Sequence, residues 1–506
     1  MRRSRGFILI SIIFVLLLAA EGIAKPVALT ILHTNDTHGH LMPFSYPGMV
    51  QAGSDLAGVE IRSDIGGIAR RATLVRRIRT ELKQRDIPVW VVDAGDFSDG
   101  TPFSTKYHGE ADIAAMNAVG YDFATLGNHE FNYRLAQTKK LLSLARYPIL
   151  CANAVETATG KLLAPASIVQ LIGPLRIALF GLVTSEAVTY PAAREGVKIT
   201  EEVETARRMA AMLRPQADII IAISHSGEEV DQQIANAVPG VDVIIGGHSH
   251  SRLPVGEFIW RSEDLKEDDV NGVVIVQDHQ WGGELGRLDL LFVQDDKGVW
   301  HVGRYRARLI PVTGDIPADE AVAAVVDRFW KPIARYYGEI IGQAAADFSS
   351  RCDDQANYNL VADAIWATFK TDIVLENIGG VRAPLVKGKI TRGDLVTMDP
   401  FNNTIVTFKI RGGVLRQLLK EQTPAVSGLR YRVERGEVIE ATCAGRPLED
   451  DRIYTGATNS YFAENWLKDL EVKDTGQRRL NVLINYVREK GTVTPAYDGR
   501  RVVIEH

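Results

Sequence analysis

The sequence predicts an α/β protein in which one chain carries two α/β domains. Apolar, β-rich runs alternate with amphipathic helical stretches, an order typical of sheets covered by helices. The length of 506 residues exceeds what one hydrophobic core covers, because single cores stop growing at roughly 250–300 residues. A helical stretch interrupted near Pro332 separates two such α/β series. We therefore expect a domain at 25–312, a connector at 313–341 and a second domain at 342–506.

The first 24 residues have the pattern of a secretory signal peptide. Arginines at the extreme N-terminus precede an apolar stretch from Phe7 to Ala20, and small residues at Gly22 and Ala24 form the exit. The apolar stretch is shorter than the ~20 residues that span a bilayer, so cleavage after Ala24 is favoured over an uncleaved anchor. We expect an exported protein, periplasmic or extracellular, with no membrane attachment after cleavage.

Composition excludes several classes of protein. The chain is 46% hydrophobic and 24% charged, with a net charge of −5, so it lacks the polybasic character of proteins that bind nucleic-acid polymers. Three cysteines in an exported chain are too few for a disulfide framework. The protein is expected to fold on its hydrophobic core, and no protein partner is predicted.

Within the first domain, five apolar runs each end in a polar cluster. They read "PVALTILHTNDTH", "IPVWVVDAGDFSDG", "YDFATLGNHEF", "ADIIIAISHSG" and "VDVIIGGHSH". Runs this apolar are typical of strands that are covered on both faces. Helices are expected between them, one with an apolar stripe at Ile68, Ala72, Val75, Ile78 and Leu82 and a solvated face carrying Arg70, Arg71, Arg76, Arg77 and Arg79.

The second domain repeats the alternation of strands and helices. Strands are expected at "TDIVLENIGG" and "TIVTFKI", and a helix is expected at "GGVLRQLLKE". The stretch "GDIPADEAVAAVVDRFWKPIARYYGEIIG" before them reads as a helix that Pro332 interrupts or kinks. This stretch is the predicted connector.

The polar residues at the ends of the five runs form a candidate metal site. They are Asp36, His38, Asp96, Asn128, His129, His225, His248 and His250. In α/β sheets, sites form beyond the carboxyl ends of strands, so these side chains are expected to converge. We expect Gly246 and Gly247 to let the backbone turn tightly, and an extended segment to send His248 and His250 to the same side.

Imidazole and carboxylate together suit a divalent Zn, Mn, Fe or Co ion. The residues exceed what one ion needs, and a shared carboxylate can hold two ions about 3.5–4 Å apart, as in phosphatases. A remaining histidine near the scissile bond can protonate a leaving alkoxide. The sequence therefore predicts two divalent metal ions and phosphoester chemistry.

The blocks "ILHTNDTHGHL", "VVDAGDFSDGTPF", "TLGNHEF", "ISHSG" and "IIGGHSH" closely resemble those of the calcineurin-like metallophosphoesterases. In particular, they look like the secreted bacterial 5′-nucleotidase family, which includes UDP-sugar hydrolases and 2′,3′-cyclic nucleotide phosphodiesterases. The resemblance covers nearly the whole mature chain. It implies a sheet sandwich flanked by helices, followed by a smaller α/β domain, the C-terminal 5′-nucleotidase domain, that binds substrate.

The resemblance also implies roles for the strand-end residues. One ion would be held by Asp36, His38 and His250 and the other by Asn128, His225 and His248, with Asp96 bridging them. His129 would stabilise or protonate the phosphoryl transition state. Many relatives read "GNHEFD", with the aspartate pairing with this histidine, whereas here the residue is Asn132. An amide can orient an imidazole but cannot stabilise its charge.

A nucleotide substrate needs cations for its phosphate and flat faces for its base. Arginine offers a planar fork for phosphate oxygens, and stacking contributes roughly 1–3 kcal/mol per base. Resemblance to the family's "NxGxxR" and "PF" blocks marks Asn377, Arg382 and Phe401 in the second domain. Arg351, upstream of "NLVADAI" as the family arginine is, and Tyr461, in "TNSYFAENW", are the other candidates. The arginines and the asparagine would bind phosphate or ribose, and the two aromatic residues would enclose the base.

We therefore expect an exported dimetal phosphohydrolase that cleaves phosphate esters of nucleotides, of the 5′-nucleotidase type, by in-line attack of water. Family members usually read "GGD" after the residue that matches Tyr461, whereas this chain reads "ENWLKDL". This difference and Asn132 leave a 2′,3′-cyclic-nucleotide 2′-phosphodiesterase/3′-nucleotidase as an alternative, and a UDP-sugar hydrolase is a further one. More distant alternatives are a thiosulfate-ester hydrolase and a non-catalytic nucleotide-binding protein.

Overall fold

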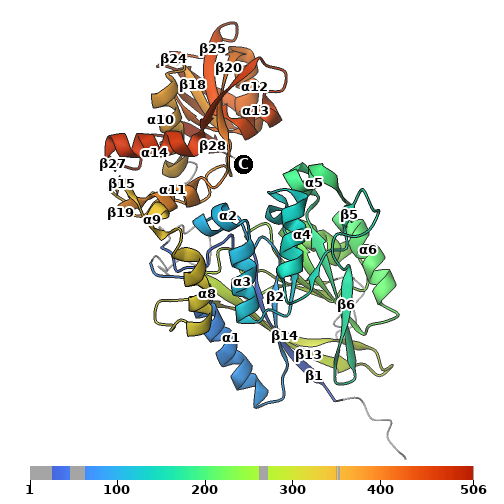
Figure 1. Cartoon of the computed structure of the whole chain (residues 1–506). Coiled ribbons are helices and arrows are strands. Elements are labelled where there is room, and N and C mark those ends of the chain that lie inside the picture. Colours follow the sequence, from blue (N-terminus) through green and yellow to red (C-terminus); the bar gives the residue numbers. More distant parts are fainter. Residues whose placement is uncertain (1–24, 46–62, 261–271, 349, 352–353, 505–506) are drawn as a thin grey trace, which may run out of the picture.

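The computed structural model describes residues 25–45, 63–260, 272–348, 350–351 and 354–504, which form two α/β units (Figure 1). The predicted signal peptide lies outside these residues, and so does the side chain of Arg351. Within the described part of the chain, no helix is long and apolar enough to cross a membrane.

The N-terminal unit is built on two six-stranded sheets. The first has the order β14-β13-β1-β2-β3-β4 and the second the order β11-β12-β10-β9-β7-β6. The strands of the first sheet are β1 (Val27–Thr34), β2 (Val89–Asp93), β3 (Phe123–Thr125), β4 (Ile149–Leu150), β13 (Glu284–Gln294) and β14 (Trp300–Pro311). Those of the second are β6 (Ser167–Ile172), β7 (Leu175–Val183), β9 (Ile219–His225), β10 (Val243–Gly246), β11 (Glu257–Trp260) and β12 (Gly272–Val276). A small separate pair joins β5 (Ala154–Glu156) to β8 (Val197–Ile199).

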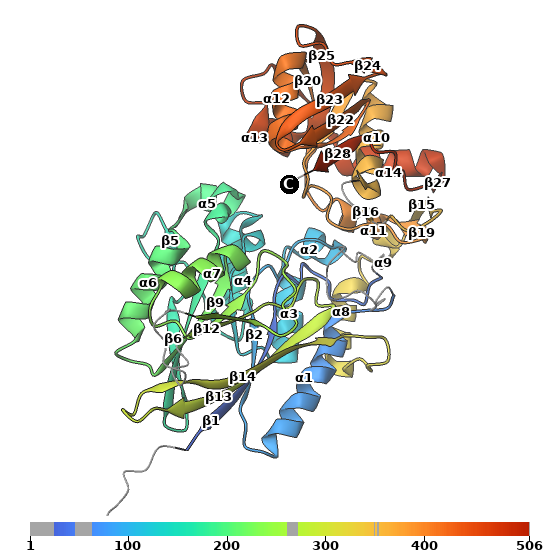
Figure 2. The ribbon, with the colours of Figure 1, turned by 180° about the vertical axis from the view of Figure 1, so that it is seen from behind.

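The two sheets pack face to face and are flanked by helices (Figures 1 and 2). One buried cluster joins Ile31 and Val92 of the first sheet to Ile221 and Ile245 of the second, so it fills the space between the sheets. The helices of this unit are α1 (Ile68–Lys83), α2 (Pro102–Tyr107), α3 (Glu110–Val119), η1 (His129–Phe131), α4 (Leu135–Leu144), η2 (Ser185–Thr189), α5 (Pro191–Gly196), α6 (Glu202–Leu213), α7 (Glu228–Ala237) and α8 (Glu320–Trp330). Separate clusters hold α1, α3 and α8 to the first sheet and α6 and α7 to the second. The predicted sandwich is confirmed.

Helix α1 buries the predicted apolar stripe, but one of its arginines is not solvated as expected. Arg71 is buried, because it follows Ile68 by three residues and so lies on the face that Ile68 and Val75 turn towards the core. Its charge lowers the pKa of the buried carboxyls of Asp93 and Asp278, against the dominant effect of burial, which raises it. A buried guanidinium is tolerated beside such acidic partners.

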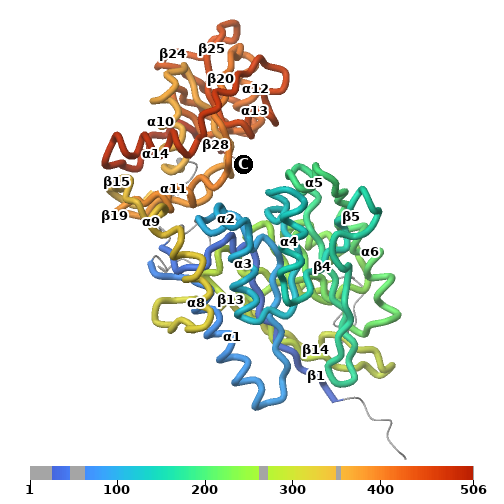
Figure 3. Tube along the Cα trace, viewed as in Figure 1, coloured from blue at the N-terminus to red at the C-terminus, as the bar shows by residue number. Residues whose placement is uncertain are grey.

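The parallel strands of each sheet end at the same level. Thr34 at the end of β1 pairs with Asp93 at the end of β2, and Gly246 at the end of β10 pairs with Ser224 in β9. The loops that follow these strands therefore emerge along one edge of the sandwich. This edge faces the C-terminal unit, whose trace lies above it in Figure 3.

The connection between the units is an interrupted helix, as predicted. Helix α8 ends at Trp330, Pro332 follows, and α9 (Ala334–Tyr337) begins two residues later. Ile333, Tyr337 and Val396 form a small apolar cluster at the junction, with Trp330 packed against it. This cluster anchors the connector to the C-terminal unit.

The C-terminal unit is a second α/β fold with a five-stranded sheet of order β21-β18-β25-β20-β26. The strands of the whole C-terminal unit, in this sheet and in smaller ones, are β15 (Ile340–Ala344), β16 (Ser350–Arg351), β17 (Asp354–Gln355), β18 (Ile373–Glu376), β19 (Gly388–Thr391), β20 (Thr404–Arg411), β21 (Ala425–Ser427), β22 (Leu429–Glu434), β23 (Glu437–Cys443), β24 (Arg446–Pro447), β25 (Ile453–Asn459), β26 (Val472–Arg478), β27 (Thr492–Val493) and β28 (Arg501–Ile504). Its helices are α10 (Ala356–Phe369), α11 (Arg392–Met398), α12 (Gly412–Gln422), α13 (Ser460–Trp466) and α14 (Arg479–Lys490). The strands and helix predicted at "TDIVLENIGG", "TIVTFKI" and "GGVLRQLLKE" are confirmed as β18, β20 and α12.

A buried ion cluster ties this unit together. The fully buried guanidinium of Arg479 donates to Asp399 Oδ1 at 2.6 Å, to Glu376 Oε2 at 2.5 Å and to the carbonyl of Gly380 at 2.6 Å. Arg479 starts α14, Glu376 ends β18 and Asp399 follows α11. One side chain therefore holds three segments, including the loop 377–382 that carries two of the predicted substrate residues.

We predict that Arg479→Ala lowers the free energy of unfolding of the C-terminal unit by about 3–5 kcal/mol, because it leaves two buried carboxylates without their cation. Hydrogen exchange of β18 and β20 in the full chain, followed in increasing urea, measures this loss. Arg478→Ala removes an exposed neighbouring arginine and is expected to change it by less than about 1 kcal/mol. Equal protection in the two variants would contradict the assignment.

Candidate active site

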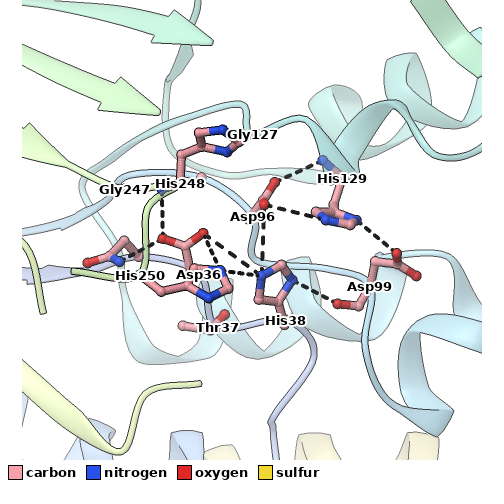
Figure 4. Close-up of polar contacts among 12 residues, drawn as sticks. Asp36, Thr37, His38, Asp96, Asp99, Gly127, His129, Gly247, His248 and His250 are labelled. Carbon is pink, nitrogen blue, oxygen red and sulfur yellow. Dashed lines mark hydrogen bonds and ion pairs between the residues drawn. The ribbon is translucent and has the colours of Figure 1, made fainter. Parts of the chain in front are cut away.

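The strand-end residues of the N-terminal unit converge in three overlapping groups (Figure 4). The groups are Asp36, His38 and His250; His38, Asp96 and His129; and Asp96, His225 and His248. Within each group, one candidate ligand atom from every residue lies within 4.8 Å of the others. Asn128 joins the third group, since its Oδ1 lies 3.2 Å from His225 Nε2. The side chains predicted from five separate strand ends thus meet in one place.

The backbone of this site adopts the left-handed region at several residues that are not glycine. They are Asp36, His38, Asp96, Asp99, His248 and His250, with φ between 46° and 76°. Each such conformation costs about 1–3 kcal/mol and persists only where the surrounding fold imposes it. The expectation of an extended "HSH" segment is wrong: His248 and His250 both have positive φ, and they reach different groups, His225 and Asp36 respectively.

Glycines serve close approach here, not a turn as expected. The segment bends at His248 and His250, while a Cβ on Gly247 would lie 2.8 Å from the carbonyl oxygen of Ala94. The contact is tighter at Gly127, where a Cβ would lie 2.1 Å from Asp96 Oδ1. Only glycine allows the loop after β3 to pass this close to the carboxylate.

Hydrogen bonds on the outer side of two imidazoles fix which nitrogen faces the centre. His38 Nδ1 donates to the carbonyl of Asp99 at 2.9 Å, and His225 Nδ1 donates to the carbonyl of Ala94 at 2.7 Å. The Nε2 lone pair of each ring is therefore directed inwards. Carbonyl partners fix the tautomer of metal-binding histidines in the same way. His38 Nε2 lies 3.2 Å from His250 Nε2 and 3.9 Å from Asp36 Oδ1.

The electrostatics of the cluster favour cations. Burial opposes ionisation of Asp36, yet the His250 and His225 imidazoles hold its pKa well below the ordinary value, and its buried Oδ1 has no hydrogen-bond partner among the residues that the structure describes. Burial likewise opposes charge on His225, but Asp96 and Asp36 raise its pKa to about 10. A field that attracts a proton so strongly also attracts a metal ion. The donor set and the unpartnered oxygen fit divalent cations.

His129 lies at the side of the cluster and has two polar neighbours on its outer nitrogen. Its Nε2 faces Asp96 Oδ2 at 3.8 Å, and its backbone N–H donates to Asp96 Oδ1 at 2.8 Å. Its Nδ1 lies 2.9 Å from Asp99 Oδ2 and 2.9 Å from Asn132 Nδ2. Asn132 therefore does contact the imidazole, but an aspartate from another loop contacts it as well.

Sequence reasoning missed three supporting residues. Glu130 accepts hydrogen bonds from the backbone N–H groups of Asp96, at 3.0 Å, and Gly127, at 2.8 Å, and so ties together the loops after β2 and β3. The hydroxyl of Tyr190 accepts from Asn128 Nδ2 at 2.8 Å, which turns the amide oxygen towards His225. Asp99 is the third. Glu130 and Asp99 lie inside blocks already singled out, whereas nothing in the sequence marks Tyr190.

The C-terminal unit reaches the cluster through Arg382. Its Nη2 donates to His38 Nε2 at 3.0 Å, so this guanidinium stands at the cluster edge. Asn377 begins the same loop, and its Oδ1 accepts a hydrogen bond from Asn459 Nδ2 at 2.9 Å. Tyr461 is half exposed at the start of α13, and Phe401 is part-buried in the loop before β20. The side chain of Arg351 lies outside the described residues.

Arg134, which follows the "GNHEFNY" stretch, has an ordinary extended backbone conformation. It has φ −69° and ψ 151°, and its exposed side chain donates to Glu195 Oε1 at 2.7 Å. A glycine is therefore not required at this position.

Comparisons with known proteins agree with this geometry. Residues 29–252 match the family described as Calcineurin-like phosphoesterase, and residues 340–468 match 5′-nucleotidase, C-terminal domain. The chain is 29% identical to the 5′-nucleotidase of Diplobatis ommata over 96% of this chain and 91% of that protein. A 5′-nucleotidase precursor from Thermus thermophilus superposes with a TM-score of 0.82 at 26% identity, covering 95% of this chain and all of that one.

A second solved structure, a sulfate thiohydrolase from Thermus thermophilus, superposes with a TM-score of 0.81 at 22% identity, which shows a shared fold alone. The sandwich, the cluster at its edge and the matches together define a metal-dependent phosphoester hydrolase. The chain belongs to the family in which a calcineurin-like phosphoesterase domain is followed by a 5′-nucleotidase C-terminal domain.

We predict that Gly127→Ala weakens metal binding at least tenfold, the scale on which disturbing the groups around a ligand acts. The new methyl group would displace Asp96 from the position in which it contacts His38, His129 and His225. Metal bound per chain after dialysis against graded chelator measures the effect. Gly413→Ala is the matched control, because a Cβ there would be 3.7 Å from its nearest neighbour. Unchanged metal content in Gly127→Ala would contradict the prediction.

Proposed function

We propose that this protein is an exported phosphohydrolase that uses two divalent ions to remove phosphate from nucleotides, in the manner of a 5′-nucleotidase. The observation that carries the proposal is the contact between Arg382 and His38. It brings a phosphate-binding type of side chain from the C-terminal unit to the metal-ligand cluster of the N-terminal unit. The names of the relatives at 26–29% identity, including an NAD 5′-nucleotidase of Haemophilus influenzae, support a nucleotide as the substrate.

The proposed ligand sets are those that the family resemblance implies. Asp36, His38 and His250 would hold one ion, Asn128, His225 and His248 would hold the other, and Asp96 would serve both. Bound there, a pair of divalent ions polarises the phosphoryl group and makes a water molecule more acidic. Zn, Mn, Fe and Co all suit this mixture of imidazole and carboxylate.

The chain's own residues supply binding and proton transfer. The guanidinium of Arg382 can donate two parallel hydrogen bonds to the phosphoryl oxygens. His129 Nε2 faces the same space and carries the proton that the leaving ribose oxygen accepts as its bond to phosphorus breaks. Asn377 and Arg351 contribute to the binding of phosphate or ribose, and Phe401 and Tyr461 offer faces for the base.

Tyr461 is suited to this role because its phenol interacts electrostatically with Tyr190 of the N-terminal unit. Burial, Asp96 and Tyr461 all raise the pKa of Tyr190, so the two phenols lie within electrostatic reach of each other. Tyr190 also packs edge-on against His129, with ring centroids 5.7 Å apart. A base held by Tyr461 would thus sit beside the residue assigned to proton transfer.

A substrate panel tests the proposal. Release of phosphate from AMP, 2′,3′-cyclic AMP, UDP-glucose and 4-nitrophenyl phosphate is measured with Mn²⁺ or Zn²⁺, and sulfate release from a thiosulfate ester is measured in parallel. AMP is expected to be the best substrate. Asn132 is the feature that favours the cyclic-phosphodiesterase alternative. Preference for 2′,3′-cyclic AMP would therefore reassign the reaction within the family. Tight nucleotide binding without turnover would overturn the proposal.

We predict that His129→Ala keeps its metal while kcat on AMP falls by about 10²–10⁴, the usual contribution of a positioned acid. Metal content and phosphate release are measured on the same preparation. His301→Ala, which removes a half-buried histidine in β14, is expected to match the wild type. Loss of metal from His129→Ala would show that the residue is a ligand.

We predict that Phe401→Ala raises KM for AMP about 5- to 150-fold, the equivalent of the roughly 1–3 kcal/mol that stacking contributes per base. Ribose 5-phosphate has no base, so its KM should change little. Equal effects on the two substrates would mean that the ring supports the fold and not the base.

A further inference from the structure

Asp99 lies in the loop after β2, three residues beyond Asp96, and its carboxylate turns away from the metal-ligand cluster (Figure 4). It is buried, and its Oδ2 lies 2.9 Å from His129 Nδ1. Asn132 Nδ2 donates to the same oxygen. Two side chains from different loops thus meet on the outer nitrogen of one imidazole.

Hydrogen-bond chemistry decides which of them holds the ring. An ionised carboxylate only accepts, and an amide nitrogen only donates. If His129 Nδ1 carries a proton, it donates to Asp99, and the amide of Asn132 donates to Asp99 as well. If Nδ1 is bare, it accepts a hydrogen bond from the amide, and the buried carboxylate loses the imidazole as a donor. The first arrangement gives the buried carboxylate oxygen two donors, which favours Asp99 as the partner of the imidazole, with Asn132 supporting Asp99.

The backbone of Asp99 adds a second constraint. Its carbonyl accepts from His38 Nδ1 at 2.9 Å, and its φ of 71° is a left-handed conformation that aspartate and asparagine tolerate better than other side chains. One residue therefore orients both a candidate metal ligand and the candidate proton donor.

We propose that Asp99 is the positioning carboxylate of His129. It fixes the ring with Nδ1–H outwards and Nε2 towards the reacting phosphate, and it stabilises the imidazolium form. As the bond from phosphorus to the leaving oxygen breaks, the Nε2 proton moves to that oxygen while the Nδ1 proton stays on His129. The inference rests on the proposed function, and it accounts for an asparagine at 132, because the carboxylate is supplied from the loop after β2.

The leaving group provides the test of this role. Asp99→Asn keeps the shape, the backbone carbonyl and a residue suited to positive φ, and it removes the charge and replaces one acceptor oxygen by an NH2 group. The variant is expected to lower kcat on AMP by about 10²–10⁴, as in other enzymes whose orienting aspartate becomes an amide. On 4-nitrophenyl phosphate, whose leaving group needs no proton, the loss should be below about tenfold. A merely structural role would lower both rates by the same factor.

The exchange Asp99→Asn/Asn132→Asp is the second variant. Asn132 Nδ2 lies 2.9 Å from His129 Nδ1, so a carboxylate oxygen in its place would be at hydrogen-bond distance. The exchange should recover kcat on AMP at least tenfold over Asp99→Asn and restore the wild-type ratio between the two substrates. It also keeps the charge of the cluster, so it carries the test if the single variant is unstable.

Glu195→Gln is the matched control, since it removes a nearby carboxylate that pairs with Arg134 on the surface, and it should behave as the wild type. Melting temperature and metal content are measured for every variant. Equal losses on the two substrates, or no recovery in the exchange, would overturn the role of Asp99. The proposed function would still hold in that case, provided that the wild type releases phosphate from AMP. No turnover of any nucleotide by the wild type would overturn both.

Discussion

The catalytic unit depends on one electrostatic constraint: electron-rich atoms are packed together in a buried place. The carboxylates of Asp36 and Asp96 lie within reach of the inward-facing lone pairs of His38 and His225, and within the described part of the chain Asp36 Oδ1 has no hydrogen-bond partner. Such an arrangement is costly unless cations neutralise it. The same requirement explains why the backbone tolerates left-handed conformations at so many of these positions, because the ligand atoms must point inwards from loops of different origin.

The supporting structure around the cluster serves that constraint. Gly127 lets one loop pass against Asp96, Glu130 joins that loop to the neighbouring one, and backbone carbonyls set the tautomers of two imidazoles. Across the junction, Arg382 brings a guanidinium to His38, so the two units share one centre. In the C-terminal unit the buried Arg479 holds the loop that carries Arg382, since it binds the carbonyl of Gly380 in that loop. The position of Arg382 therefore depends on contacts that are remote from the metal-ligand cluster.

The pair of Asp99 and Asn132 is the basis of the proposed positioning role. The family resemblance implies an aspartate as the partner of this histidine, whereas the chain has Asn132 at that position. In this chain a carboxylate of the same kind arrives from the loop after β2, and the amide becomes its hydrogen-bond donor. In the proposed role, the loop after β2 supplies the carboxylate at Nδ1 of His129.

The sequence by itself determined the features that depend on local pattern. Apolar runs predicted the strands, their ends predicted which side chains meet, and a proline predicted the break between α8 and α9, because strand burial and backbone chemistry are written in neighbouring residues. Only the tertiary structure decided the conformation of His248 and His250, the burial of Arg71, and the partners supplied by Asp99, Tyr190 and Arg479. These depend on contacts between residues far apart in the chain, and no local periodicity encodes which distant groups come within hydrogen-bond distance.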